Sequence, residues 1–171
     1  MTSTSDVLRA CFHHHIWATL ALIDALESLP ADRLEAQIPG TYGSMHKTVA
    51  HLAAADGRYL LRLTGEQLPP YTDVEEPPTL DRLRAGMRDH ADRWTAFLDR
   101  LDAGTLDVTL AGRPDYPETP HAEGLFLLQA LHHGNDHRTQ ICTVLSSNGF
   151  VAPDLDVWTY WMDRRLDAAG C

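Results

Sequence analysis

The chain has 171 residues, a length that fits one domain over residues 1–171 and allows a substantial hydrophobic core. Hydrophobic residues make up 44% of it and charged residues 22%, which is typical of a globular protein and excludes a disordered or collagen-like chain. The formal net charge of −10 argues against nucleic acid as a partner, and against docking on a membrane of anionic lipid.

Helical periodicity dominates the first part of the chain. Apolar residues recur every three or four positions from Leu8 to Leu29, and Pro30 is placed to end this first helix. A loop rich in proline and glycine follows. Ser44 is then a suitable N-cap for a second helix that runs to about Gly65.

The middle of the chain departs from this periodicity. An acidic linker bracketed by prolines covers 69–78, and a third helix opens near Thr79 and ends at Gly104. Residues 105–120 lack helical periodicity, and the alternation of apolar and polar side chains from Leu106 to Leu110 predicts a short strand and a small hairpin between the third and fourth helices.

The last third is helical again. Thr119 followed by proline is placed to open the longest apolar helix, from His121 to about Ser147. Pro153 and Asp154 are then predicted to open a short fifth helix. Four long helices and a short fifth predict an all-α fold, a four-helix bundle.

The cysteines and the N-terminus indicate where the protein resides. Cys11, Cys142 and Cys171 show no C-x-x-C spacing, so neither a disulfide framework nor a thiolate zinc site is expected. The first ten residues lack the pattern of a secretion signal, and no stretch is apolar enough to span a membrane. We therefore expect a soluble, cytoplasmic protein.

Ten histidines are the most unusual feature of the composition. Two ligands on one helix must be three or four residues apart to project the same way, and only His133 and His137 have this spacing. The consecutive His13, His14 and His15 point about 100° apart, so at most one of them can enter an internal site. We interpret this triplet as a partly exposed polar cluster, with His15 on the apolar face of its helix.

The pair on the fourth helix is predicted to face the bundle interior. His133 and His137 share an apolar stripe with Phe126, Ala130 and Ile141. Burying two imidazoles without partners costs free energy, and a metal ion would satisfy both. Two core histidines that are hydrogen-bonded to neighbouring helices are the alternative.

A third histidine strengthens the metal hypothesis. His51 is the only polar side chain of residues 49–55, and a histidine in such a stretch is by itself more often a core residue than a ligand. Next to an inward-facing pair it becomes the natural third ligand. Three histidines with a fourth position open are the pattern of catalytic zinc, and nickel or another divalent ion that favours imidazole fits equally well.

These segments resemble the DinB/YfiT-like superfamily of metalloenzymes. Residues 132–141 (HHGNDHRTQI) resemble its signature, in which a histidine is followed four positions later by a His-Arg-Gly-Gln-like run. Residues 44–52 with Asp56 are similar to its first-ligand helix, 12–18 to its N-terminal helix and 153–160 to its C-terminal one. The resemblance implies a four-helix bundle, commonly homodimeric, in which His51, His133 and His137 hold a divalent ion.

The function implied is metal-assisted chemistry on a small molecule. Three neutral imidazoles leave the charge of the ion undiminished, so it can lower the pKa of a bound water or thiol. Known members of the superfamily are thiol-dependent transferases and isomerases, so the resemblance favours a low-molecular-weight-thiol-dependent S-transferase over a hydrolase. The alternative is a non-catalytic metal-binding or stress-response bundle that dimerises or sequesters a small ligand.

The chain also departs from the pattern of the family. Thr139 stands where glycine is usual, and Asp136 and Gln129 stand where many members have histidine, which can alter the support of the ligands or the polarity of the pocket. Arg138 and Asp136 flank His137 but point away from it, so each is expected either to orient an imidazole or bind substrate, or to form a solvated or helix-bridging ion pair. Asp56 is placed to reach a neighbouring helix, either to orient a ligand or in a structural role.

Other residues with catalytic potential are interpreted as structural. No Ser-His-Asp or Cys-His constellation is present in the pattern, and Cys142 is expected to pack in the core. The same interpretation covers five aromatic residues: Trp17, Tyr59, Trp94, Trp158 and Trp161.

Overall fold

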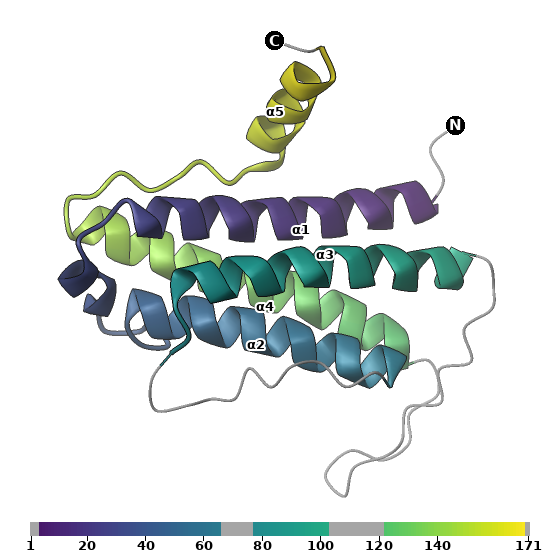
Figure 1. Ribbon diagram of the computed structural model, residues 1–171, viewed down its shortest axis with the longest axis horizontal. Coiled ribbons are helices and arrows are strands. Elements are labelled where there is room, and N and C mark those ends of the chain that lie inside the picture. Colours follow the sequence, from purple (N-terminus) through teal and green to yellow (C-terminus); the bar gives the residue numbers. More distant parts are fainter. Residues whose placement is uncertain (1–3, 66–76, 103–121, 170–171) are drawn as a thin grey trace, which may run out of the picture.

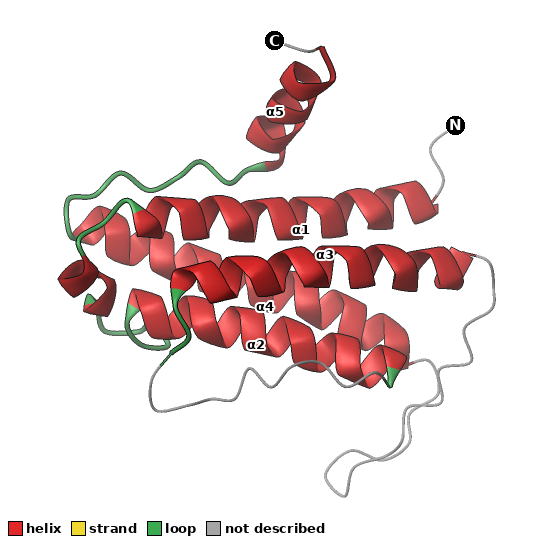
Figure 2. Ribbon diagram, in the orientation of Figure 1, coloured by secondary structure: helices red, strands yellow, loops and turns green. Residues whose placement is uncertain are grey.

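Helices make up most of the part of the protein that the structure describes. The computed structural model describes residues 4–65, 77–102 and 122–169. Within these ranges it contains five α-helices, one short 3-10 helix and no strand, which confirms the all-α prediction (Figure 2). The hairpin predicted within 105–120 lies outside the described residues.

The four long helices form a bundle. α1 and α4 run in one direction and α2 and α3 in the other (Figure 1). α1 packs against α3 and α4, and α2 packs against the same two helices. The elements are α1 (Thr4–Glu27), the 3-10 helix η1 (Ala31–Glu35), α2 (Met45–Thr64), α3 (Leu80–Asp102), α4 (Ala122–Ser147) and α5 (Val157–Ala169).

The ends of α2 follow from its sequence. The side chain of Ser44 accepts a hydrogen bond from the backbone N–H of Lys47 at 3.2 Å, as expected of an N-cap. At the other end Gly65 has φ +71°, a left-handed conformation that glycine adopts without steric cost, and its N–H donates to the Leu61 carbonyl at 2.9 Å. Both predicted boundaries of this helix are confirmed.

Two elements differ from the prediction. α5 begins at Val157 and not near Pro153, because its N-cap is Asp156, whose carboxylate accepts from the Thr159 N–H at 2.8 Å. The preceding Asp154 carboxylate instead accepts from the Thr159 hydroxyl. The short helix η1 was not predicted, since its five residues contain no buried side chain and therefore no apolar period.

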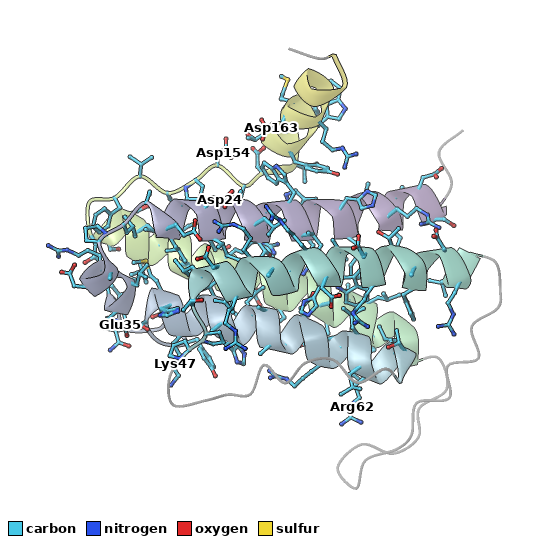
Figure 3. All side chains as sticks on the ribbon, viewed as in Figure 1. Asp24, Glu35, Lys47, Arg62, Asp154 and Asp163 are labelled. Carbon is cyan, nitrogen blue, oxygen red and sulfur yellow. The ribbon has the colours of Figure 1, made fainter. Side chains whose placement is uncertain are left out.

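The hydrophobic core lies between the four long helices, each of which contributes buried side chains. Phe12 of α1 and Trp94 of α3 are both 1% exposed, and their ring centroids are 4.3 Å apart. The six charged side chains labelled in Figure 3 are exposed on the outside of the molecule. Among the described residues, no helix has the length and hydropathy needed to cross a membrane.

The fifth helix lies outside the bundle and contacts α1 (Figure 1). His14 donates a hydrogen bond to the Leu155 carbonyl at 2.8 Å, and the rings of Trp17 and Tyr160 are 5.4 Å apart. Trp158 is 74% exposed and Trp161 46% exposed, so the prediction that they belong to the core was wrong. Packing on the side of α1 leaves the outer apolar surface of this short helix exposed in the part of the chain that the structure describes.

Candidate metal centre

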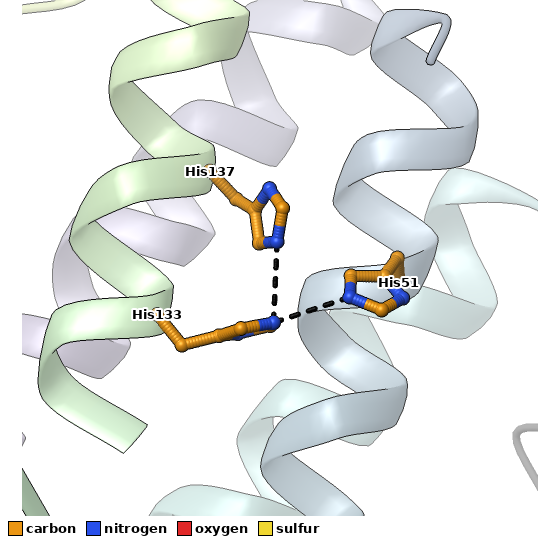
Figure 4. Close-up of side chains that lie close together, drawn as sticks. All are labelled: His51, His133 and His137. Carbon is orange, nitrogen blue, oxygen red and sulfur yellow. Dashed lines mark hydrogen bonds between the residues drawn. The ribbon is translucent and has the colours of Figure 1, made fainter. Parts of the chain in front are cut away.

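Three histidines from two helices converge between α2 and α4 (Figure 4). His133 and His137 are four residues apart on α4 and therefore project from the same face, while His51 reaches them from the adjacent α2. Nε2 of His133 lies 3.1 Å from Nε2 of His51 and 3.1 Å from Nε2 of His137. The structure thus brings together the three residues that the sequence singles out.

The donor atoms have the chemistry and spacing that suit a divalent ion. All three donor nitrogens lie within 4.8 Å of one another. Ligands about 2.0 Å from a tetrahedral zinc ion are separated by about 3.3 Å, close to the distances found here. In the described part of the chain no carboxylate or thiolate joins the group, so an ion bound here would have three protein ligands and an open position.

The environment keeps His133 in the form that can bind a metal. Burial lowers the pKa of His133 to about 4, with further contributions from its histidine neighbours His137 and His51. The imidazole is therefore neutral at neutral pH and presents a nitrogen lone pair without first releasing a proton.

His137 is oriented by a neighbour on its own helix. Its Nδ1 donates a hydrogen bond to the side-chain oxygen of Gln140 at 3.2 Å, which leaves the lone pair on Nε2 directed towards the other two histidines. The same Gln140 oxygen accepts from the backbone N–H of Tyr42 at 3.0 Å. Gln140 was not predicted as a site residue, although its i+3 spacing from His137 places it on the same face of α4.

Two tyrosines flank the histidines. The ring of Tyr42 stacks on His51, with centroids 4.0 Å apart, and meets His137 edge-on at 5.4 Å. Tyr59, which was expected in the core, is half-buried and lies edge-on to His133 at 5.9 Å. Because Tyr42 is 44% exposed, the centre borders solvent on its side. Tyr42 lies in a loop, where no periodic pattern could have identified it.

Asp56 is buried among residues of α1 and α3. One carboxylate oxygen accepts from Nε2 of His15 at 3.1 Å, and the other accepts from the Trp94 indole at 3.0 Å and lies 3.1 Å from Nδ1 of His90. Burial raises the pKa of the Asp56 carboxyl, but interactions with His15 and His90 outweigh this effect and hold the pKa below its ordinary value. Asp56 is therefore an ionised group that links three helices.

Arg138 is also buried and links α4 to α1. One of its guanidinium nitrogens donates to the Thr19 hydroxyl at 3.1 Å, to Nδ1 of His15 at 3.1 Å and to the His15 carbonyl at 3.3 Å. Burial lowers the pKa of Arg138 to about 10, so the guanidinium is charged at neutral pH. Arg138 therefore bridges α4 and α1 through hydrogen bonds, with His15 between it and Asp56, and the expected ion pair is not among its contacts with the described residues.

The N-terminal histidine triplet divides into three environments. His13 is exposed, His14 is half-buried and His15 is 1% exposed. Interpreting the triplet as a partly exposed cluster was therefore wrong for His15, which lies deep in the bundle. Its position on the apolar face of α1 was the signal that distinguished it.

The remaining departures from the family pattern lie at the surface. Gln129 and Asp136 are exposed, and so is Thr139, whose hydroxyl donates to the Asn135 carbonyl on its own helix. Cys142 packs against the core as expected, and burial raises the pKa of its thiol. A raised pKa disfavours the thiolate, so the local chemistry does not suit a cysteine nucleophile.

Comparison with known proteins identifies one family. A sequence model described as the DinB superfamily matches residues 14–141, a range that contains all three histidines of the centre. No curated protein and no solved structure matches the chain.

Proposed function

Because the chain belongs to the DinB superfamily, we propose that it is a metal-dependent enzyme that binds a divalent ion, zinc or nickel, through His51, His133 and His137 and acts on a small molecule. The observation that carries the proposal is the convergence of the three Nε2 atoms, with His133 at 3.1 Å from each of the others. Three imidazole nitrogens that face one another in a partly buried site are costly to desolvate, and a shared ion would satisfy them.

Each residue of the centre has a defined part in this proposal. A divalent ion held by neutral imidazoles keeps its full charge and lowers the pKa of a thiol or water bound beside it. His133 supplies its lone pair at neutral pH, and Gln140 holds His137 in the tautomer that can bind. Tyr42 borders the side on which a substrate can approach.

The three-histidine donor set suits activation of either water or a thiol, because a divalent ion held there would lower the pKa of both. The resemblance to thiol-dependent transferases and isomerases of the superfamily is what favours the thiol. We therefore propose transfer of a low-molecular-weight thiol to a small electrophile, with hydrolysis as the second candidate.

Metal analysis of purified protein tests the centre. Wild type, His133→Ala and His132→Ala are purified without a nickel column and their metal content is measured by mass spectrometry. We expect about one divalent ion per chain in wild type and a large loss in His133→Ala. His132 is the matched control because it is the adjacent, exposed histidine, and His132→Ala should retain its metal. Equal metal in wild type and His133→Ala would contradict the proposal.

An activity panel tests the chemistry. Metal-loaded protein is incubated with low-molecular-weight thiols and electrophiles, and consumption of both is followed by mass spectrometry. We expect a reaction that stops on addition of a chelator and resumes when zinc or nickel is restored. If the loaded protein leaves every pair unreacted, the non-catalytic metal-binding alternative is favoured instead.

A further inference from the structure

A second buried polar cluster lies in the bundle, centred on His15. Its Nε2–H donates to the Asp56 carboxylate at 3.1 Å, and its Nδ1 accepts from the Arg138 guanidinium at 3.1 Å. An imidazole that donates on one side and accepts on the other is neutral, so the buried negative charge of Asp56 is balanced by the positive charge of Arg138. His15 thus joins two opposite charges that do not touch each other.

This cluster connects the two helices that carry the three histidines of the candidate metal centre. Asp56 lies on α2, five residues after His51, and Arg138 follows His137 directly on α4. His15 belongs to α1 and contacts both. The relative placement of α2 and α4 at the level of the centre therefore depends on a side chain from a third helix.

Gly134 shows how closely His15 approaches α4. A Cβ atom at this position would lie 2.4 Å from Cε1 and 2.6 Å from Nδ1 of His15, and 3.0 Å from the Arg138 guanidinium. The His15 ring occupies the space that any side chain at position 134 would need. Gly134 lies directly after His133, within the helical turn that ends at His137.

We propose that His15, Asp56 and Arg138 are positioning residues of the metal centre: the His15 ring, seated on Gly134 and bonded to Asp56, sets the separation and rotation of α2 and α4 at which the three Nε2 atoms meet. The part concerning metal rests on the proposed function, whereas the part concerning geometry stands on the contacts themselves. Metal–ligand distances tolerate deviations of only about 0.2 Å, so a small displacement of α2 or α4 would lower the metal affinity of the centre.

Substitution of Gly134 tests the proposal without changing a ligand or a charge. Gly134→Ala introduces the overlap with His15, although alanine favours helix more than glycine does. Gly124→Ala is the matched control, because Gly124 also lies in α4 but a Cβ there would meet nothing within 4 Å. Both variants are compared with wild type in zinc affinity by chelator competition, in the visible spectrum of the cobalt(II) form, and in helicity.

We expect Gly134→Ala to keep its helicity, to bind zinc roughly tenfold or more weakly and to show an altered cobalt spectrum, as found when residues that support metal ligands are changed. Gly124→Ala should match wild type in all three measurements. Wild-type affinity and spectrum in Gly134→Ala would overturn the proposal.

A readout without metal separates this proposal from the proposed function. The imidazole 15N shifts of His51, His133 and His137 in metal-free protein report their tautomers and contacts. If wild type binds no metal but Gly134→Ala still changes these shifts, the enzyme proposal fails and the positioning role stands. Unchanged shifts in Gly134→Ala overturn the positioning role.

A second pair of variants covers the case in which Gly134→Ala does not fold. His15→Gln retains a donor for Asp56 and an acceptor for Arg138, whereas His15→Leu retains neither. We expect His15→Gln to keep a cobalt spectrum close to that of wild type and His15→Leu to lose it. Identical metal binding in the two variants would also overturn the proposal.

Discussion

The side chain of Gln140 performs two tasks with one oxygen atom. It accepts from Nδ1 of His137 at 3.2 Å and from the backbone N–H of Tyr42 at 3.0 Å. The first bond selects the tautomer of a candidate ligand, and the second holds the loop that carries the aromatic ring over His51. A residue with no metal contact of its own therefore affects both the ligand and the entrance of the centre.

Removing this oxygen should weaken metal binding. Gln140→Leu leaves Nδ1 of His137 without its acceptor, and we expect zinc affinity to fall roughly 10- to 100-fold, as is usual when the partner of a ligand is lost. Gln140→Glu keeps an acceptor at the same place. Its zinc affinity should therefore be close to that of wild type and higher than that of Gln140→Leu. Chelator competition measures both. Equal affinities of the two variants would show that the hydrogen bond does not orient His137.

At the scale of elements, α2 carries one candidate ligand and depends on its N-cap. The Ser44 side chain is 8% exposed and satisfies the Lys47 N–H, one of the first N–H groups of the helix that have no partner within it. Packing against α3 and α4 then buries the apolar face of α2. The start of α2 is thus determined locally and its orientation by its neighbours.

Loss of the N-cap should lower stability in a measurable way. We expect Ser44→Ala to reduce the free energy of unfolding by about 1 kcal/mol. Ser28→Ala is the control: Ser28 is exposed, and its hydroxyl donates to the Ala25 carbonyl near the end of α1 and caps no N–H group. Urea unfolding followed by circular dichroism compares the variants. A larger loss in Ser28→Ala than in Ser44→Ala would contradict the assignment of the cap.

At the scale of the whole molecule, buried titratable groups couple folding to pH. The pKa of His133 is about 4 in the folded protein against 6.5 as its ordinary value, so the unfolded chain binds more protons between these two values. Asp56, whose pKa is also held below its ordinary value, contributes in the same direction at still lower pH. The ionised Asp56 stabilises the folded state at neutral pH and loses this contribution in acid, whereas His133 destabilises the folded state in acid, because the unfolded chain then binds a proton that the buried imidazole binds poorly.

The stability of metal-free protein should therefore fall on acidification. We expect the free energy of unfolding to decrease as the pH drops from about 6.5 to about 4, and to decrease less in His133→Gln, whose side chain does not titrate. Urea unfolding of chelator-treated protein across this range measures the difference. Parallel curves for wild type and His133→Gln would show that His133 is not protonated differently in the two states.

The outer surface of α5 carries a group of exposed apolar side chains. Val157, Trp158, Trp161 and Met162 are all exposed on it. The homodimer implied by the family resemblance stays a prediction, and the mass of the protein in solution, measured by sedimentation equilibrium, would decide it.

The sequence by itself determined the helices and the three histidines of the candidate centre. Helix ends follow local rules, as Ser44 and Gly65 show, and a spacing of four on an apolar stripe is enough to place His133 and His137 on one inward face. The choice of His51 as their companion rested on its being the only polar side chain in a packed segment, and the structure places it there.

Only the tertiary structure decided how the other polar residues are used. His15, Asp56 and Arg138 are far apart in sequence and lie on three different helices, yet they are in contact in the folded protein. Tyr42 reaches the metal centre from a loop. Periodicity reports which face of a helix is buried but not which residue of another helix lies opposite, because that pairing depends on the rotation and separation of packed helices. The same limit explains α5, whose aromatic pattern predicted burial although it contacts the bundle only on the side of α1 in the described residues and leaves Trp158 and Trp161 exposed.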